Sequence, residues 1–232
     1  MSDPRGLSRD ADKRRVRLSL GAFALLMLAG GGTRVASATP AVHDGISARP
    51  PRAVVAGVPF APTTIQTFAH RVIATRDNDG MPYVVIDKLT AQVFVFDAGG
   101  NLQASAAALL GLARGDRSIP GVGDKKLSAI RPQERITPAG RFVASLGHDT
   151  HGQQILWIDY RDAIALHPVV KGTPQERRAE RLNSATSQDN RISYGCINVP
   201  RLFYNTFVSA AFAHTSGIVY ILPELATTPG LL

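Results

Sequence analysis

The sequence predicts a mainly β protein, with its strands arranged as a β-sandwich or barrel-like sheet accompanied by a few short helices. Three observations favour this fold class. Short runs of β-branched and aromatic residues recur between residues 81 and 223, separated by turn-forming residues. Helical periodicity is confined to brief stretches instead of alternating with the strands, as βαβ units require. The length of 232 residues, 44% hydrophobic and 19% charged, suits one globular domain with extensions.

The first 38 residues have the composition of an export signal. Met1 to Arg17 is basic and polar, Leu18 to Gly32 is apolar, and Ala36-Ser37-Ala38 offers a small-residue cleavage site. The apolar stretch is short for a permanent membrane helix, and a retained N-terminal anchor is the alternative. Arg14-Arg15 also leaves the twin-arginine route open. We therefore expect an exported protein of the periplasm or cell envelope, which contacts a membrane only through this segment if it is not cleaved.

The net charge is modest once this segment is set aside. Seven Lys and Arg and three Asp and Glu stand before Thr39, so the remainder carries +4 instead of the full +8. A weakly cationic protein suits an anionic polymer such as the cell wall. The arginines are spread out and no nucleic-acid-binding motif accompanies them, so we expect no nucleic-acid partner. We expect a monomer.

The N-terminal part of the mature chain should be an arm followed by one helix. Residues 39–62 are rich in Ala, Pro, Val and Gly, which predicts a flexible arm. Apolar residues then recur at helical spacing from Thr64 to Arg76, with Thr63 or Thr64 as the N-cap. Turn-forming residues follow, so 63–80 should form a helix and a turn.

The strand pattern occupies residues 81–223, which we expect to form one domain. The predicted strands are, in order, 83–87, 92–96, 102–112, 142–146, 154–158, 163–166 and 218–222. Residues 113–127 are rich in Gly and Pro and predict a loop. Residues 224–232 should be a C-terminal tail.

A short, highly charged surface helix is predicted between His167 and Cys196. Thr173-Pro174-Gln175-Glu176 reads as a capping box with Pro at the first helical position, and arginines including Arg178 and Arg181 follow it. A second helix should run from Pro200 to about Ala213. Its predicted inward face consists of Leu202, Phe203, Phe207 and Val208.

Cys196 is the only cysteine, so an exported chain cannot close an internal disulfide with it. An acyl-transfer thiol needs an activating base, donors for the oxyanion, and access. Gly195 lets a carbonyl approach the backbone, and the N–H groups of Tyr194, Gly195 and Cys196 offer an oxyanion hole. Asn198 can orient a loop or a ligand through its amide. The alternative is that the cysteine is a small, inert buried residue.

This run resembles the signature of the L,D-transpeptidases, the YkuD-type domain. The signature has an upstream histidine, then Ser/Thr-His-Gly-Cys, a hydrophobic residue and Asn. The matching residues are Ser193, Gly195, Cys196, Ile197 and Asn198, and the upstream histidine corresponds to His167. Residues 137–142 are similar to the family's Thr-Pro-x-Gly-x-Phe turn, and the hairpin at 83–101 is similar to its opening strand pair. The resemblance spans about 81–223.

The resemblance implies a YkuD-like sandwich with a charged helix inserted before the catalytic Cys loop. It also implies cysteine-dependent acyl transfer on peptidoglycan stem peptides. Cys196 would attack before the terminal D-Ala of a tetrapeptide donor, His167 would be its base, and Ser193 and Gly195 would complete the catalytic set. Water in place of an acceptor amine would make an L,D-carboxypeptidase, and a non-catalytic cell-wall-binding protein with this fold is the other alternative. No metal or organic cofactor is expected, because His167 and backbone donors suffice.

The chain departs from the family pattern at two positions beside the expected site. Tyr194 replaces the histidine next to the catalytic glycine, so thiolate stabilisation should rest more on His167. Pro168 replaces the glycine that follows the upstream histidine, which removes a backbone donor. Three arginines are candidates to hold a stem-peptide carboxylate, with a solvated helix face as the alternative; they are Arg178, Arg181 and Arg191.

Two further patterns are assigned to structure. His148 and His151 flank Asp149 in a Gly-containing turn, a spacing that suggests metal ligands. No further ligand set accompanies them, so we expect surface polar residues and no metal site. Trp157 should lie in the core.

Overall fold

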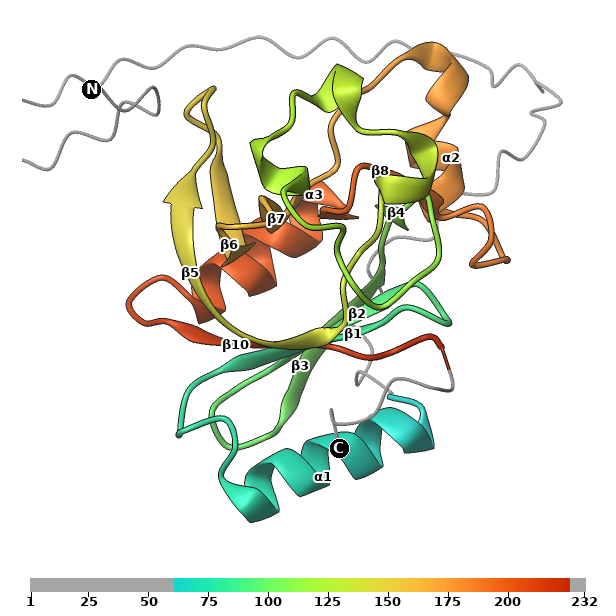
Figure 1. The fold of residues 1–232 in the computed structure, drawn as a ribbon. Helices are drawn as coiled ribbons and strands as arrows, with labels where there is room; N and C mark the ends of the chain where they lie inside the picture. The colour runs from blue at the N-terminus through green and yellow to red at the C-terminus, as the bar shows by residue number, and fades with distance from the viewer. Residues whose placement is uncertain (1–60, 226–232) are drawn as a thin grey trace, which may run out of the picture. The chain divides into compact units, whose positions relative to one another are not determined.

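A mixed sheet of eight strands is the framework of the structure, a computed structural model that describes residues 61–225 (Figure 1). In spatial order the strands are β3 (Leu102–Ala107), β2 (Gln92–Phe96), β1 (Tyr83–Asp87), β10 (Gly217–Ile221), β5 (Gly140–His148), β6 (Gln154–Asp159), β7 (Ile164–Pro168) and β9 (Ile197–Val199). A separate ladder joins β4 (Leu110–Gly111) to β8 (Arg191–Ser193). The predicted mainly β fold is confirmed.

The two edges of the large sheet approach each other, so the sheet nearly closes into a barrel. Leu109, just beyond β3, exchanges two backbone hydrogen bonds with Asn198 of β9, at 2.8 and 2.9 Å. The two layers of the predicted sandwich are therefore opposite walls of one curled sheet. β1 runs parallel to β10 and β7 runs parallel to β9, while the other neighbours in this sheet are antiparallel.

The predicted export signal and nearly all of the predicted arm lie outside the described residues. The described residues belong to one compact unit of the chain. Among residues 61–225, no helix combines the length and the apolar character needed to cross a bilayer.

Helix α1 (Thr63–Thr75) covers the outer face of the sheet and forms a second core there. Its buried side chains include Ile65 and Phe68, and the Phe68 ring meets the Tyr220 ring edge to face at 5.1 Å. The helix predicted for this segment is thus present. The predicted threonine N-cap is wrong, because Pro62 occupies the N-cap position and no side chain caps the helix.

The segment after Pro200 is helical and fills the inside of the curled sheet. It comprises α3 (Arg201–Phe203), a π-helical turn η5 (Tyr204–Val208) and α4 (Ser209–Ala211). The π turn puts Phe203 and Val208, five residues apart, on the same inward face. Leu202, predicted to face inward, is 65% exposed, so that part of the prediction is wrong. Phe207 is partly buried against the interior core.

The remaining helical elements are short and lie in the two long connections. The connection before β5 contains the 3-10 turns η1 (Val122–Asp124), η2 (Leu127–Ala129) and η3 (Pro132–Glu134). The predicted charged helix is present in two pieces, η4 (Pro174–Glu176) and α2 (Arg178–Leu182). Arg177 separates these pieces with a left-handed backbone, at φ 47°.

Lys88 is a fully buried cation at the end of β1. Its ammonium group donates to the carbonyls of Gly115 and Thr137 at 2.7 and 3.0 Å, and it pairs with the Asp116 carboxylate at 2.5 Å. Burial lowers the pKa of Lys88, and the hydrogen bond to Asp116 opposes that effect. An unpaired ammonium in this position would be strongly destabilising.

Glu224 extends this ion cluster to the strand that precedes Cys196. One of its carboxylate oxygens lies 3.8 Å from the Lys88 ammonium, and the other lies 2.5 Å from the Arg191 guanidinium. Arg191 also donates to the Lys88 carbonyl at 2.8 Å. The predicted tail starts at Glu224, yet the Glu224 side chain is 1% exposed and its N–H donates to Asp116.

The substitution Glu224→Gln should lower the free energy of unfolding by about 3 kcal/mol, because two buried cations would lose one of their carboxylates. Denaturant titration of the purified protein measures this change. The matched control is Arg161→Gln, which removes a guanidinium that is 87% exposed and paired with Asp162. The control should change stability by less than about 0.5 kcal/mol. Equal losses in the two variants would contradict a structural role for the cluster.

Candidate active site

The parallel pairing of β7 with β9 builds the centre of the site. In this register His167 stands directly beside Asn198. His167 Nδ1 lies 2.9 Å from the Pro168 carbonyl, an arrangement in which Nδ1–H donates and Nε2 carries the lone pair. Pro168 lacks an N–H, yet its carbonyl is the group that orients the imidazole.

Cys196 sits in the turn between β8 and β9, and Gly195 determines the shape of that turn. Gly195 has φ 132°, a conformation that L side chains rarely adopt. A Cβ at this position would stand 2.8 Å from the Ile136 carbonyl oxygen, so a larger residue would displace the turn. Cys196 Sγ is partly exposed and lies 3.5 Å from the Ala163 carbonyl.

Cys196 and His167 open into the same cavity. Its volume is about 190 Å³, and its other lining residues are Asp149, Gln153, Ile155, Trp157, Ala163, Ala165 and Val170. Trp157 was predicted to lie in the core, but it is half-buried at the cavity wall and its ring stacks on Tyr160 at 4.8 Å. Asp149 and Gln153, in the turn after β5, supply polar groups to the cavity wall, and neither of them had been assigned to the site from the sequence.

The buried Ser193 side chain stabilises the cysteine turn through two hydrogen bonds to its backbone. Its hydroxyl donates to the Cys196 carbonyl at 2.6 Å and accepts the Gly195 N–H at 3.1 Å. The Gly195 N–H, one of the predicted oxyanion donors, is therefore already engaged. This leaves the N–H groups of Tyr194 and Cys196 as the candidate donors.

Thr137 fixes the peptide that joins Gly195 to Cys196. Its fully buried hydroxyl donates to the Gly195 carbonyl at 2.7 Å and accepts the Gly111 N–H at 2.8 Å. The C=O and N–H of a trans peptide point in opposite directions, so this bond turns the Cys196 N–H away from Thr137. Sequence reasoning identified Thr137 only as part of a turn motif, and that motif was the available signal for this role.

The Tyr194 ring, beside Gly195 in the cysteine turn, contacts a cation. The Arg135 guanidinium lies 4.0 Å from the centre of the Tyr194 ring. A guanidinium over an aromatic face is attracted by the ring's negative face. Arg135 therefore places a positive charge beside the cysteine turn, and the sequence pattern gave no sign of it.

The surroundings favour the neutral forms of both reacting groups. Burial raises the pKa of the Cys196 thiol, although the backbone N–H groups of Ala165 and Cys196 oppose this. Burial also lowers the pKa of His167, and the positive charge of Arg178 adds to that effect. The Pro168 carbonyl and Asp149 act in the opposite direction. At neutral pH the resting pair is therefore a thiol and a neutral imidazole.

The three candidate carboxylate-binding arginines lie in different environments. Arg178 is buried and donates to the Asn198 side-chain oxygen at 2.8 Å. Arg191 is 7% exposed and paired with Glu224, so the structure places it in the ion cluster. Arg181 donates to the carbonyls of Glu176 and Asp189, both at 2.8 Å. The structure therefore does not bring the three guanidinium groups together.

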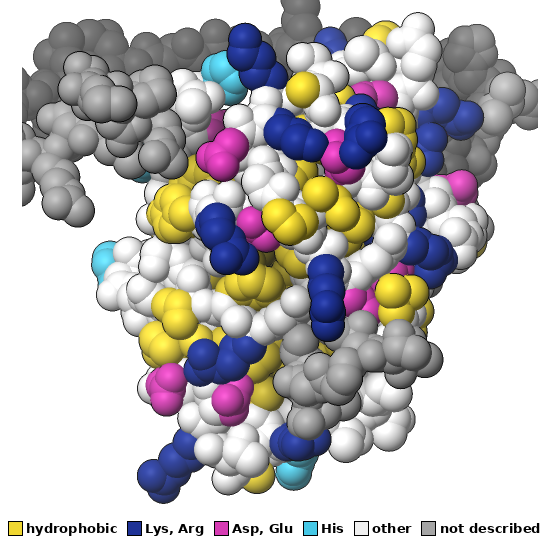
Figure 2. Space-filling model, in the orientation of Figure 1, with side chains coloured by type: hydrophobic (Ala, Val, Ile, Leu, Met, Phe, Trp, Pro, Cys, Tyr) yellow, Lys and Arg dark blue, Asp and Glu magenta, His cyan; other side chains and the backbone are white. Residues whose placement is uncertain are grey.

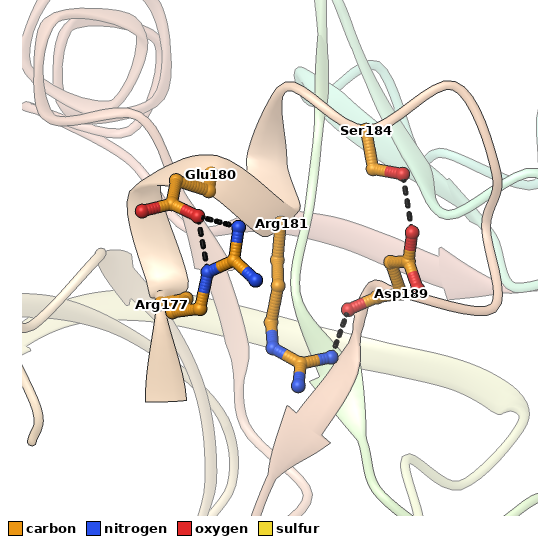
Figure 3. Close-up of a pocket in the computed structure, with 5 residues that line it drawn as sticks. All are labelled: Arg177, Glu180, Arg181, Ser184 and Asp189. Atoms are coloured by element: carbon orange, nitrogen blue, oxygen red, sulfur yellow. Dashed lines mark hydrogen bonds and ion pairs between the residues drawn. The ribbon is translucent and has the colours of Figure 1, made fainter. Parts of the chain in front are cut away.

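Arg181 lines a separate polar pocket of about 290 Å³ beside α2 (Figure 3). The other residues that line it are Arg177, Glu180, Ser184 and Asp189. Arg177 pairs with Glu180, and the Ser184 hydroxyl donates to the Asp189 carboxylate at 2.6 Å. Elsewhere on the molecule, Lys and Arg side chains are spread over the surface shown in Figure 2 and form no single basic patch there. Within residues 61–225, no three His, Cys, Asp or Glu side chains are grouped to hold a metal ion.

The chain resembles several solved structures, although no family model and no curated protein sequence matches it. One is the helical cell shape determining protein Pgp2 from Campylobacter jejuni, with TM-score 0.41 and 12% identity over 65% of this chain and 50% of that one. Another is the catalytic domain of an E. faecium L,D-transpeptidase, with TM-score 0.33 and 14% identity over 61% and 96% of the two chains.

A third is an L,D-transpeptidase from Mycobacterium tuberculosis H37Rv, with TM-score 0.37 and 15% identity over 61% of this chain and 57% of that one. The aligned part thus spans 50% of the length of Pgp2 and 57% of the mycobacterial protein. With every one of these TM-scores below 0.5, the similarities do not decide the chemistry of the site.

The substitution Thr137→Val keeps the shape of the side chain but removes the hydroxyl, which leaves the Gly111 N–H and Gly195 C=O without that partner. The free energy of unfolding should fall by about 2–4 kcal/mol, since each group is buried. Amide hydrogen exchange at Gly111 should also become faster. Thr137→Ser retains the hydroxyl and should stay close to the parent protein in both measurements. Identical behaviour of the Val and Ser variants would contradict this role.

Proposed function

We propose that this protein is an L,D-transpeptidase-like acyltransferase that acts on peptidoglycan stem peptides through a thioester on Cys196. The observation that carries the proposal is the placement of Cys196 and His167 on one cavity, with the motif residues Ser193, Gly195 and Asn198 arranged around them. A thiol, an oriented imidazole and directed backbone N–H groups are the parts that acyl transfer requires.

In the first half of the reaction, His167 Nε2 takes the proton of the Cys196 thiol as the sulfur attacks. The target is the carbonyl between meso-diaminopimelate and the terminal D-Ala of a tetrapeptide stem. The resulting oxyanion is stabilised by the N–H groups of Cys196 and Tyr194. The carbon–nitrogen bond then breaks, D-Ala leaves with the proton returned by His167, and a thioester remains.

In the second half, an acceptor amine attacks the thioester carbon. His167 removes a proton from that amine, the carbon–sulfur bond breaks, and the thiolate recovers the proton. A new amide joins donor and acceptor. The chemistry needs no metal or organic cofactor, because every proton and charge is handled by His167 and the backbone.

The resting state has a consequence for the first step. Both groups are neutral before substrate binds, so thiolate formation has to accompany attack on the carbonyl instead of preceding it. Substrate in the cavity excludes water and strengthens the interaction of the oxyanion with its donors. The export of the chain to the periplasm or cell envelope belongs to the same proposal, since its substrate is found there.

Purified tetrapeptide muropeptides incubated with the protein should lose D-Ala and gain new cross-links or exchanged termini, measured by mass spectrometry. Cys196→Ala should lower this turnover at least about a thousandfold, because the nucleophile is lost. The matched control is His151→Ala, which changes an exposed histidine in the turn after β5 and should leave turnover unchanged.

The outcome also separates the related activities. D-Ala loss with water as the only acceptor would identify a carboxypeptidase. Unchanged stems with the parent protein would contradict acyl transfer on this substrate. If the stems stay unchanged but the protein co-sediments with cell-wall sacculi, the result would support the wall-binding alternative.

A further inference from the structure

Arg178, the first residue of α2, is a buried cation at the site. It is 8% exposed, although the sequence predicted a surface helix here, with Arg178 either a ligand for a stem-peptide carboxylate or part of a solvated helix face. Its Nη1 donates to Asn198 Oδ1 at 2.8 Å, and its Nε donates to the Glu176 carboxylate at 2.7 Å. The inserted charged segment is thereby tied to the strand that pairs with His167.

This contact determines which way the Asn198 amide faces. A guanidinium has only donors, so the oxygen of the amide has to face Arg178. The amide nitrogen then faces the Cys196 carbonyl at 3.5 Å and His167 Nε2 at 3.3 Å. Both neighbours fit this orientation, because a carbonyl and an imidazole lone pair are acceptors.

The orientation of the amide favours one protonation state of His167. Its Nδ1–H is already used by the Pro168 carbonyl, so Nε2 is the atom that gains or loses a proton. If Nε2 were protonated, its N–H would face the side-chain N–H of Asn198. Two hydrogen-bond donors would then face each other, which disfavours the imidazolium. A reversed amide would instead offer its oxygen to a protonated Nε2 and stabilise the imidazolium.

We propose that Arg178 is a positioning residue that, by holding the Asn198 amide nitrogen toward His167, keeps His167 in the neutral form until the thiol transfers its proton. The role of His167 as the base rests on the function proposed above. The charged and titratable groups around the imidazole are Arg178 from α2, Asp149 from the turn after β5, and the Cys196 thiol. Glu176 pairs with Arg178 on the side away from Asn198 and partly balances its charge.

The test is an NMR titration of ¹⁵N-histidine-labelled protein, which reports the pKa of His167 directly. In Arg178→Met the amide is free to reverse and the positive charge is gone, so the pKa of His167 should rise by about one unit. Arg178→Gln keeps a donor for Asn198 but removes the charge, so its rise should be smaller. Arg178→Lys keeps both the donor and the positive charge, so its His167 pKa should match that of the parent protein.

The matched control lies next to Arg178 in the chain. Arg177→Gln removes a guanidinium that is 68% exposed and paired with Glu180, and it should leave the pKa of His167 unchanged. A second readout is the rate at which iodoacetamide alkylates Cys196 at pH 6. This rate should increase several-fold in Arg178→Met, because a more basic His167 favours the thiolate.

An unchanged pKa of His167 in folded Arg178→Met would overturn the proposal. So would equal rises in the Met and Gln variants, which would show that the orientation of the amide has no effect. If Arg178→Met does not fold, Arg178→Ala, which also removes both the donor and the charge, is compared with Arg178→Gln in its place: a higher pKa of His167 in Ala supports the proposal, and equal values overturn it. Neither readout uses peptidoglycan, so a failed turnover assay with a shifted pKa would count against the proposed function alone.

Discussion

The buried ammonium of Lys88 is the constraint on which much of the structure depends. A fully buried cation is tolerated only when its protons all find acceptors and a counter-charge is close. Lys88 meets this condition through hydrogen bonds to the Gly115 and Thr137 carbonyls and the Asp116 carboxylate. The carboxylate of Glu224 is a second counter-charge nearby. Segments far apart in the sequence therefore converge on the end of β1, and the chain beyond β10 is held in place although it contributes no strand.

The same cluster is connected to the turn that carries Cys196 in two ways. Glu224 holds Arg191, the first residue of β8, and β8 leads directly into the turn that carries Cys196. Lys88 holds the Thr137 carbonyl, and the Thr137 hydroxyl holds the Gly195 peptide. The position of Cys196, the proposed nucleophile, is thus fixed by the ion cluster on one side, while β7 and β9 fix the position of His167 on the other. Rigid support of this kind is what a preorganised oxyanion site requires.

Most strands could be predicted because alternation and β-branched runs are local signals. The three-residue strands β8 and β9 were missed, and the strand predicted at 102–112 is divided into β3 and β4. A motif led us to expect Cys196 and His167 to act together, and both line one cavity. The pairing of these strands in the sheet could not be predicted. Nothing local indicates that β10 inserts between β1 and β5, or that β7 pairs in parallel with β9. Glu224 was predicted to begin a tail, and Arg178 was predicted to lie on a surface helix. From the sequence alone, a charged residue is assigned to the surface unless its buried partner is known. Leu202 was misplaced because a π turn changes the helical period that the prediction assumed.

A neutral resting pair suits a protein whose only cysteine is expected to work outside the cytoplasm. A thiolate is the form of cysteine that oxidants attack, so a thiol kept protonated between turnovers is protected. Beside the cysteine turn, the Tyr194 ring carries the Arg135 guanidinium, which cannot accept a proton. The proposed proton transfer therefore depends on His167 of β7. Since Arg178 and Asn198 oppose its protonation, the thiolate gains stability only when a substrate carbonyl takes up the charge, and reactivity is confined to the occupied site.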